Sequence, residues 1–259
     1  MHDTYEAETA RLQGGRCQGP RLGIIGGGQL ARMTALAALP LGCEVVVLER
    51  NPLSPGARLA PLSLVGDWED PEVLEELAER VDVVTLENEF VPAEALRHLE
   101  ERRHRVFPTA ATLALTQDKL VQKQTLVGAG VPVPRFRAVD SAAELTAAGR
   151  DWGWPLVLKA RRNGYDGRGN VTVRSATESA AAWGRLGGPA RELYVEEFWP
   201  FARELAVIIT RGRHGETAAY PVVETIQRNH VCHEVRAPAE VAPETAARAV
   251  DLALRAVAA

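Results

Sequence analysis

The sequence of 259 residues predicts an α/β domain followed by an α+β domain. Between residues 21 and 108, short apolar runs alternate with helical patterns, which is typical of a small doubly wound sheet. After residue 135, strand-like segments are joined by a turn at residues 212–215, which favours antiparallel pairing. A stretch rich in glycine and proline at residues 128–134 separates the two patterns.

The first pattern begins with a strand, three glycines and a helix, which together indicate a βαβ unit. Asp70 and Pro71 mark the start of a later helix, as its N-cap and its first helical residue. The expected strands are residues 22–25, 44–48, 62–65, 81–85 and 105–107, and the expected helices are residues 29–39, 92–103 and one that begins at residue 71. Because helices link most of these strands, we expect a parallel sheet.

The second pattern follows a helix expected over residues 110–128, which glycine and then proline bring to an end. Ser141 and Glu144 form a capping box at the start of the next helix. Further strands are expected at residues 154–158, 171–173, 193–196, 204–210 and 217–223, and further helices at residues 177–186 and 243–259. The expected divisions are a disordered extension at 1–20, domains at 21–108, 135–199 and 200–259, and a connecting helix and linker at 109–134.

Composition narrows the class of protein. A net charge of −4 gives no basic footprint for nucleic acid or an anionic membrane. Cys17, Cys43 and Cys232 are odd in number and lack C-x-x-C spacing, which fits a reducing cytosol better than a disulfide framework or a zinc site. No apolar run reaches the roughly 18 residues of a membrane span, and the first segment lacks the apolar centre of a signal peptide. We therefore expect a cytoplasmic protein.

The most informative segment runs from Lys159 to Asn170, directly after an apolar strand. Gly164, Gly167 and Gly169 are interspersed there with charged side chains. Glycines let backbone N–H groups approach an anion closely, and basic side chains supply positive charge. Such a segment can fold over a polyphosphate and exclude water from it. ATP chemistry is therefore the first hypothesis.

Two loops of the first domain are candidate ligand sites. Residues Gly26 to Ala31 fit the pattern G-x-G-x-x-A, and Glu49 lies about 20 residues further on. This pattern fits a dinucleotide such as NAD, another anionic ligand at the helix N-terminus, or a purely structural turn. Glu87 and Glu89 follow a strand at the edge where open α/β sheets bind ligands. They suit sugar hydroxyls or a cationic group, or they form a solvated acidic loop.

Three clusters of the second domain have both a functional and a structural interpretation. Lys119 and Lys123 lie one helical turn apart, facing either a ligand or solvent. Residues 196–199 combine backbone groups that can pair with an adenine rim and two aromatic rings, or they simply end a strand. His230 and His233 allow a metal interpretation by spacing, but no carboxylate or cysteine at matching spacing supports it.

Taken in order, these motifs resemble the ATP-grasp superfamily and, within it, the N5-carboxyaminoimidazole ribonucleotide synthetases, the ATPase subunits of phosphoribosylaminoimidazole carboxylase. The pattern D-K-x-x-x-K-x-x-L-x-x-x-G-V-P-x-P at residues 118–134 is generic to the superfamily. More specific are G-G-G-Q-L-A-R-M at 26–33, G-Y-D-G-R-G at 164–169 and R-N-x-x-x-H-E at 228–234. The resemblance covers residues 21–259. It implies a Rossmann-like preATP-grasp domain ahead of a central and a C-terminal ATP-grasp domain.

The resemblance also implies a reaction and a set of residues for it. ATP and bicarbonate would form carboxyphosphate, which carboxylates the amine of 5-aminoimidazole ribonucleotide in purine (IMP) biosynthesis. The implied catalytic residues of the loop are Tyr165, Asp166, Gly167 and Arg168. The implied ATP site consists of Lys119, Lys159, Gly164, Tyr165, Asp166, Gly167, Arg168, Gly169, Asn170, Glu196, Glu197, Phe198, Trp199, Glu204 and Gln227. The implied ribonucleotide site consists of Gly28, Gln29, Leu30, Glu87 and Glu89.

The sequence departs from the family pattern in two places. Gln227 stands where many relatives have a histidine that contacts the nucleotide. The family's ligands for ATP-bound Mg²⁺ and its site for the ribonucleotide phosphate would lie beyond residue 259, so no metal ligand is expected within these residues. We therefore expect an incomplete C-terminal domain and little or no ligase activity.

The remaining hypotheses concern other functions and the oligomeric state. The chain could be a non-catalytic nucleotide-binding fragment or another ATP-grasp carboxylate–amine ligase. An NAD-dependent oxidoreductase rests only on the G-x-G-x-x-A pattern and Glu49. The resemblance also implies a homodimer.

Overall fold

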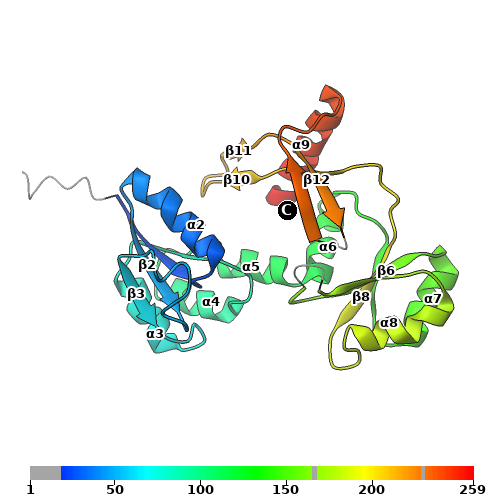
Figure 1. The fold of residues 1–259 in the computed structure, drawn as a ribbon, viewed down its shortest axis with the longest axis horizontal. Coiled ribbons are helices and arrows are strands. Elements are labelled where there is room, and N and C mark those ends of the chain that lie inside the picture. The colour runs from blue at the N-terminus through cyan, green and yellow to red at the C-terminus, as the bar shows by residue number, and fades with distance from the viewer. Residues whose placement is uncertain (1–18, 165–167, 229–230) are drawn as a thin grey trace, which may run out of the picture. The chain divides into compact units, whose positions relative to one another are not determined.

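The computed structural model describes residues 19–164, 168–228 and 231–259, and the chain forms two compact units, Met1–Ala114 and Leu115–Ala259 (Figure 1). The boundary falls within helix α5 (Ala110–Gln117). The first unit contains a parallel sheet, and the second contains antiparallel sheets. This is the predicted succession of α/β and α+β structure.

The sheet of the first unit has four parallel strands in the order β3-β2-β1-β4. Its strands are β1 (Arg21–Ile25), β2 (Glu44–Glu49), β3 (Leu62–Val65) and β4 (Val83–Leu86). Its helices are α2 (Gln29–Ala38), the 3-10 helix η1 (Leu39–Leu41), α3 (Pro71–Glu79) and α4 (Ala93–Glu101). Asp70 caps α3 as predicted, because its side chain accepts a hydrogen bond from the Glu72 N–H at 3.0 Å.

Helix α2 lies on one face of this sheet, and α3 and α4 lie on the other (Figure 1). The side chains of β2 point alternately to the two faces of the sheet, and this explains why helices cover both faces. Val45 and Val47 pack with buried alanines of α2, whereas Val46 and Leu48 pack with leucines of α3 and α4. Successive strand residues point to opposite faces, so a strand that is apolar throughout must be buried on both sides. The predicted doubly wound arrangement is confirmed.

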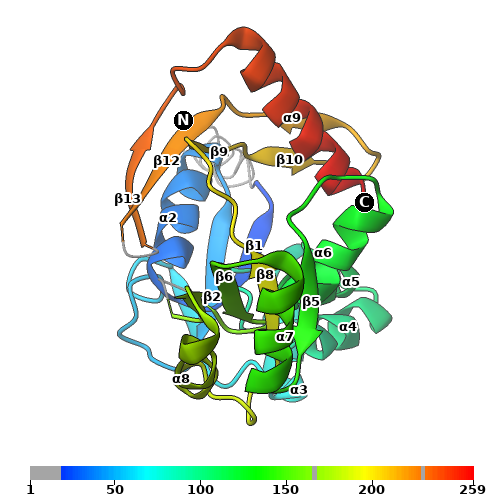
Figure 2. The same ribbon diagram turned by 90° about the vertical axis from the view of Figure 1, so that its right-hand side faces the viewer.

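The first sheet of the second unit is antiparallel, in the order β5-β8-β6-β7. Its strands are β5 (Phe136–Val139), β6 (Leu156–Ala160), β7 (Asn170–Val173) and β8 (Leu193–Glu197). Its helices are α7 (Ala142–Trp152), the 3-10 helix η2 (Ala176–Glu178) and α8 (Ser179–Arg185). Helices α7 and α8 cover the same face of this sheet, as Figure 2 shows. Ser141 caps α7 as predicted.

The opposite face of this sheet carries the polar side chains of the candidate site. Leu156 and Leu158 of β6 enter the core beneath the helices, so Lys159 between Leu158 and Ala160 lies on the other face. In the same way Leu193 and Val195 of β8 are in the core, which leaves Glu196 on the face of Lys159. The alternation of β6 and β8 therefore brings these two charges together.

The remaining elements of the second unit complete the antiparallel part. Strands β9 (Glu204–Ala206), β12 (Val223–Arg228) and β13 (Val231–Arg236) form one sheet in the order β13-β12-β9. Strands β10 (Ile209–Arg211) and β11 (Thr217–Ala219) form a separate hairpin. Helices α6 (Lys119–Gly128) and α9 (Pro243–Ala258) complete the unit. Among the described residues, no helix is both long and apolar enough to cross a membrane.

Several predicted elements differ in the structure. The helix expected over residues 110–128 is interrupted at Asp118, whose backbone is extended and whose side chain caps α6. The strand expected at 105–107 makes only an isolated bridge, between Val106 and Val84. The strand expected at 204–210 is divided into β9 and β10, which pair with different partners. The polar segment after residue 223 forms two paired strands, β12 and β13.

Candidate functional site

A cavity of about 590 Å³ lies in the second unit, on the face of the sheet opposite helices α7 and α8. Strands β6, β7 and β8 form one wall, and residues of β9 and β12 contribute to the other. Eight residues of the implied ATP site line it, namely Lys159, Asn170, Glu196, Glu197, Phe198, Trp199, Glu204 and Gln227. Segments far apart in the sequence therefore meet at one cavity.

Glu196 is the charged centre of this cavity. Lys159 Nζ lies 2.7 Å from one of its carboxylate oxygens, and Lys123 Nζ lies 2.7 Å from the other. The Glu196 side chain is only 11% exposed. Burial alone would raise the pKa of Glu196, but the two ammonium groups outweigh it and hold that pKa below its usual range. Glu196 is therefore a buried anion shared by two lysines.

Aromatic side chains follow Glu196 at the rim of the cavity. Phe198, Trp199 and Phe201 all line it and are 40%, 60% and 57% exposed. Exposed aromatic rings beside charged side chains provide flat surfaces on which a planar group can stack. The Glu197 carboxylate is already held by Arg135, at 2.9 and 3.0 Å from two guanidinium nitrogens. The Glu197 N–H also donates to the Arg135 carbonyl, at 2.8 Å, so Arg135 engages both the side chain and the N–H of Glu197.

Glu204 presents a second carboxylate on the wall formed by β9. Its Oε1 accepts hydrogen bonds from the Thr225 hydroxyl at 2.5 Å and from the Gln227 amide at 2.7 Å. Both donors lie on β12, in which Thr225 pairs directly with Glu204. The Gln227 amide therefore contacts the Glu204 carboxylate at the wall of the cavity.

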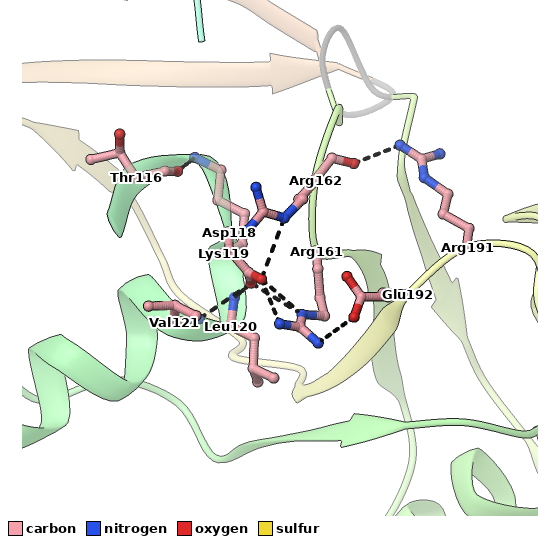
Figure 3. A network of polar contacts seen from close by, with 9 residues as sticks. All are labelled: Thr116, Asp118, Lys119, Leu120, Val121, Arg161, Arg162, Arg191 and Glu192. Carbon is pink, nitrogen blue, oxygen red and sulfur yellow. Dashed lines mark hydrogen bonds and ion pairs between the residues drawn. The ribbon is translucent and has the colours of Figure 1, made fainter. Parts of the chain in front are cut away.

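A second polar network ties the start of the glycine-rich loop to helix α6 (Figure 3). Arg161 follows β6, and its guanidinium donates to both oxygens of Asp118 at 2.5–3.1 Å. The same carboxylate accepts from the backbone N–H groups of Leu120 and Val121. Burial would raise the pKa of Asp118, but these hydrogen bonds outweigh it and lower that pKa. Lys119 Nζ is directed to the Thr116 carbonyl, at 3.1 Å.

The two ends of the glycine-rich loop come together at its base. The Ala160 N–H donates to the Gly169 carbonyl at 2.7 Å, and Lys159 pairs with Asn170 between β6 and β7. Gly169 has a φ of +119°, and a Cβ there would lie 2.8 Å from the Gly164 Cα. The Asn170 Oδ1 is buried and, among the described residues, has no hydrogen-bond partner.

Tyr165, Asp166 and Gly167 lie outside the described residues. Arg168 is described and exposed, but it does not line the cavity. Lys119 and Gly164 also do not line it.

Two carboxylates of the chain accept hydrogen bonds from the glycine loop of the first unit. The Gly27 N–H donates to Glu49 at 2.6 Å, and the Gly28 N–H donates to Glu87 at 2.5 Å. These N–H groups are therefore engaged by anions of the chain itself, which disagrees with the interpretation that an external anion binds them. The geometry favours a ligand group that donates hydrogen bonds, such as a hydroxyl. Beside these glycines, Leu30 is 56% exposed.

No metal centre is formed by the part of the chain that the structure describes. Residues 19–164, 168–228 and 231–259 contain no group of three or more His, Cys, Asp or Glu side chains that could hold a metal ion. Mg²⁺ beside a nucleotide is usually held by one or two carboxylates together with phosphate oxygens, so such a site does not require a cluster of three side chains.

Three contacts of the candidate site are not predicted by the single motifs. Lys123 pairs with Glu196, Thr225 supports Glu204, and Arg161 holds Asp118. The spacing of Lys119 and Lys123 was a signal, and so was the alternation that places Glu196 on the face of Lys159. The pairing of Thr225 with Glu204 depends on strand register, which the sequence does not reveal.

Comparison with known proteins places this geometry in a family. Residues 124–259 match the family model of the ATP-grasp domain, and residues 20–117 match that of the ribonucleotide synthetase preATP-grasp domain. An N5-carboxyaminoimidazole ribonucleotide synthase of Synechococcus elongatus is 43% identical over 224 residues, which are 85% of this chain and 55% of the relative. The chain spans about half the length of the curated relatives it matches.

Solved structures agree with this assignment. A carboxyaminoimidazole ribonucleotide synthase from Aspergillus clavatus complexed with ATP superposes with a TM-score of 0.86 at 34% identity, covering 93% of this chain and 63% of that one. The synthase from the same organism in complex with ADP and 5-aminoimidazole ribonucleotide gives a TM-score of 0.85 at 33% identity, with the same coverage. The chain described here belongs to the ATP-grasp family, with a ribonucleotide synthetase preATP-grasp domain preceding its ATP-grasp domain.

Proposed function

We propose that this chain contributes the ATP site of an enzyme that uses ATP and bicarbonate to carboxylate 5-aminoimidazole ribonucleotide. The observation that carries the proposal is the cavity in which Lys159, Glu196, Trp199 and Glu204 meet. A nucleoside triphosphate needs a cation for its phosphates, a flat apolar surface for its base and an acceptor for its ribose hydroxyls. The cavity presents one such group for each of these parts. The related synthases with bound ATP, ADP and ribonucleotide support the same assignment.

The phosphates are proposed to lie at the end of the cavity formed by β6 and β7. Lys159 lies there beside Asn170, whose buried Oδ1 has no partner among the described residues. The loop from Gly164 through Arg168 to Asn170 begins and ends at this point and is proposed to cover the phosphates. Lys119 belongs to the same proposal, because the Arg161–Asp118 contact fixes the start of its helix beside the loop.

The adenosine part is proposed to lie between β8 and β9. Residues 196–199 would hold the adenine through backbone groups, the Glu196 carboxylate and the aromatic rings. Glu204 would accept hydrogen bonds from the ribose hydroxyls, oriented for this by Thr225 and Gln227. Hydrogen bonds to an ionised carboxylate are stronger than those between neutral groups, so this contact would fix the sugar.

The ribonucleotide is proposed to bind at the glycine loop of the first unit, through Gly28, Gln29, Leu30, Glu87 and Glu89. Glu87 already accepts the Gly28 N–H, so its remaining acceptor capacity suits a sugar hydroxyl or an amine. The exposed Leu30 adds an apolar surface.

The proposed reaction has two steps. An oxygen of bicarbonate attacks the γ-phosphorus of ATP and ADP leaves, which gives carboxyphosphate. The exocyclic amine of the ribonucleotide then forms an N–C bond with the carboxyl carbon, and phosphate and a proton leave. Such transfers depend mainly on positioning and on neutralising the charge of the phosphate oxygens. Tyr165, Asp166, Gly167 and Arg168 are proposed to act near bicarbonate and the amine. A cytosolic location, a requirement for Mg²⁺ and a homodimer belong to the same proposal.

A second candidate function is nucleotide binding without turnover. It rests on the same cavity, which presents groups for each part of the nucleotide whether or not the γ-phosphate is transferred. Both candidates predict that ATP binds, so a binding measurement alone does not separate them. An NAD-dependent oxidoreductase has no comparable support, because Glu49 is engaged by the Gly27 N–H.

The test combines calorimetric titration with ATP and an assay of ADP release in the presence of Mg²⁺. ADP release that needs both bicarbonate and 5-aminoimidazole ribonucleotide would support the ligase. ATP binding without such release would support the second candidate. Failure of ATP to bind would overturn both.

A further inference from the structure

Lysine is used sparingly in this chain. Of 30 basic residues only three are lysines, Lys119, Lys123 and Lys159, and the other 27 are arginines. Two of the three contact a single carboxylate, that of Glu196. An arginine fork tends to engage both oxygens of one carboxylate, whereas an ammonium group is a compact point charge that fits one oxygen. Two lysines can therefore share Glu196, one on each oxygen.

The two lysines differ in their surroundings. The Lys123 side chain is 15% exposed, projects from helix α6 and places its ammonium 5.6 Å from the centroid of the Phe136 ring. The Lys159 side chain is 30% exposed and lines the cavity. Lys123 is thus the more enclosed partner of Glu196, and Lys159 is the one within reach of a ligand.

Charge balance gives Lys123 a role. With both lysines present, the three side chains carry a net charge of +1, which an anionic ligand can use. Without Lys123, Glu196 would neutralise Lys159 completely, and a phosphate would have to compete with a buried carboxylate for that ammonium group. In a partly buried site such competition is costly, because charges interact more strongly there than in water.

We propose that Lys123 is a positioning residue that satisfies the charge of Glu196 and so leaves Lys159 available to a phosphate. This inference rests on the proposed function for the identity of the phosphate ligand. Lys123 itself does not touch the nucleotide. It acts through Glu196, and Lys159 exchanges its carboxylate partner for a phosphate oxygen when the nucleotide binds.

The first test measures Lys159 without any nucleotide. Trace acylation with acetic anhydride, read by mass spectrometry, reports each of the three lysines separately, and only a deprotonated amine reacts. In Lys123→Met, Glu196 holds the Lys159 ammonium alone, so we expect acylation of Lys159 to slow about three- to tenfold. Gln124→Met, an exposed substitution on the same helix, is the matched control and should leave the rate unchanged. A merely structural role would leave acylation of Lys159 unchanged or accelerate it, and either result would overturn the proposal.

The second test is a double-mutant cycle on ATP affinity. Lys123→Met should weaken ATP binding about tenfold, but it should have little further effect in a Glu196→Gln background, where no carboxylate competes for Lys159. Equal losses in both backgrounds would contradict the proposal, since Lys123 would then act independently of Glu196. Circular dichroism of each variant confirms folding. If the unaltered protein fails to bind ATP, the proposed function fails, while the acylation result still decides whether Lys123 balances Glu196.

Discussion

Arg161 holds the buried carboxylate of Asp118 with hydrogen bonds from Nε at 3.1 Å to each oxygen and from Nη2 at 2.5 Å (Figure 3). The two residues are 43 positions apart in the sequence. Asp118 begins the helix that carries Lys119 and Lys123, and Arg161 begins the glycine-rich loop. This contact therefore fixes the helix with the lysines to the strand that presents Lys159.

Removal of the Asp118 carboxylate is expected to destabilise the second unit strongly. Asp118→Ala leaves the Arg161 guanidinium without its main partner and removes the cap of α6, so we expect a loss of about 3 kcal/mol in the free energy of unfolding. Urea denaturation measures this loss of free energy. Asp151→Ala is the control, because it breaks the exposed ion pair with Arg137 and should cost less than about 1 kcal/mol. Equal losses would show that the Asp118 contact contributes no more than a surface pair.

The same contact predicts how stability depends on pH. The folded pKa of Asp118 is lowered, so its stabilising effect is complete above the unfolded value of about 3.9 and is lost as the pH falls through the lower folded pKa. Stability measured from pH 6 down to pH 2.5 should therefore fall less steeply in Asp118→Asn than in the unaltered protein. Parallel pH profiles for the two proteins would contradict this linkage.

Substitution by alanine is expected to have opposite effects on stability at two helical glycines of the second unit. A Cβ at Gly149 of α7 would lie 2.0 Å from the Trp154 ring, whereas a Cβ at Gly184 of α8 would meet nothing within 4 Å. Gly149→Ala should cost about 1–3 kcal/mol through overpacking, and Gly184→Ala should add about 0.5–1 kcal/mol through helix propensity. Thermal unfolding followed by circular dichroism measures both. A stabilising Gly149→Ala would refute the described packing of Trp154.

Glu204 is expected to recognise the ribose of the nucleotide. The unaltered protein should bind ADP about tenfold more tightly than 2′,3′-dideoxyADP, which lacks the hydroxyls that donate to the carboxylate. Glu204→Ala should remove this difference, whereas Glu216→Ala, on the β10–β11 hairpin, should preserve it. Calorimetric titration measures each affinity. Persistence of the preference in Glu204→Ala would place the ribose elsewhere.

Much of the fold could be predicted because its signals are local. The unbroken apolar run of β2 indicated a strand buried on both faces, and Asp70 and Ser141 indicated helix starts that the structure confirms. The pairing of strands β12 and β13 was not predicted, because all their residues are at least partly exposed and no clear alternation of apolar and polar residues marks them.

The candidate site was predictable in its residue types but not in its contacts. Lys159 and Glu196 could be selected from their positions at strand ends, and both line one cavity. The break at Asp118 could not be predicted, because the partner that stabilises it is Arg161, far away in the sequence. The contact of Lys123 with Glu196 could not be predicted either, since it depends on where β8 places Glu196 relative to helix α6.

The most direct test of the proposed ATP site is a calorimetric titration of the unaltered protein and of Lys159→Met with ATP. Lys123 can still pair with Glu196 in this variant, so the fold should persist while the phosphates lose their cation. We predict that ATP binds the unaltered protein and that its affinity falls at least tenfold in the variant, or about 1.4 kcal/mol. Arg174→Met, at an exposed position just after β7, should bind ATP normally. Equal affinity of the unaltered protein and Lys159→Met would contradict the proposed site.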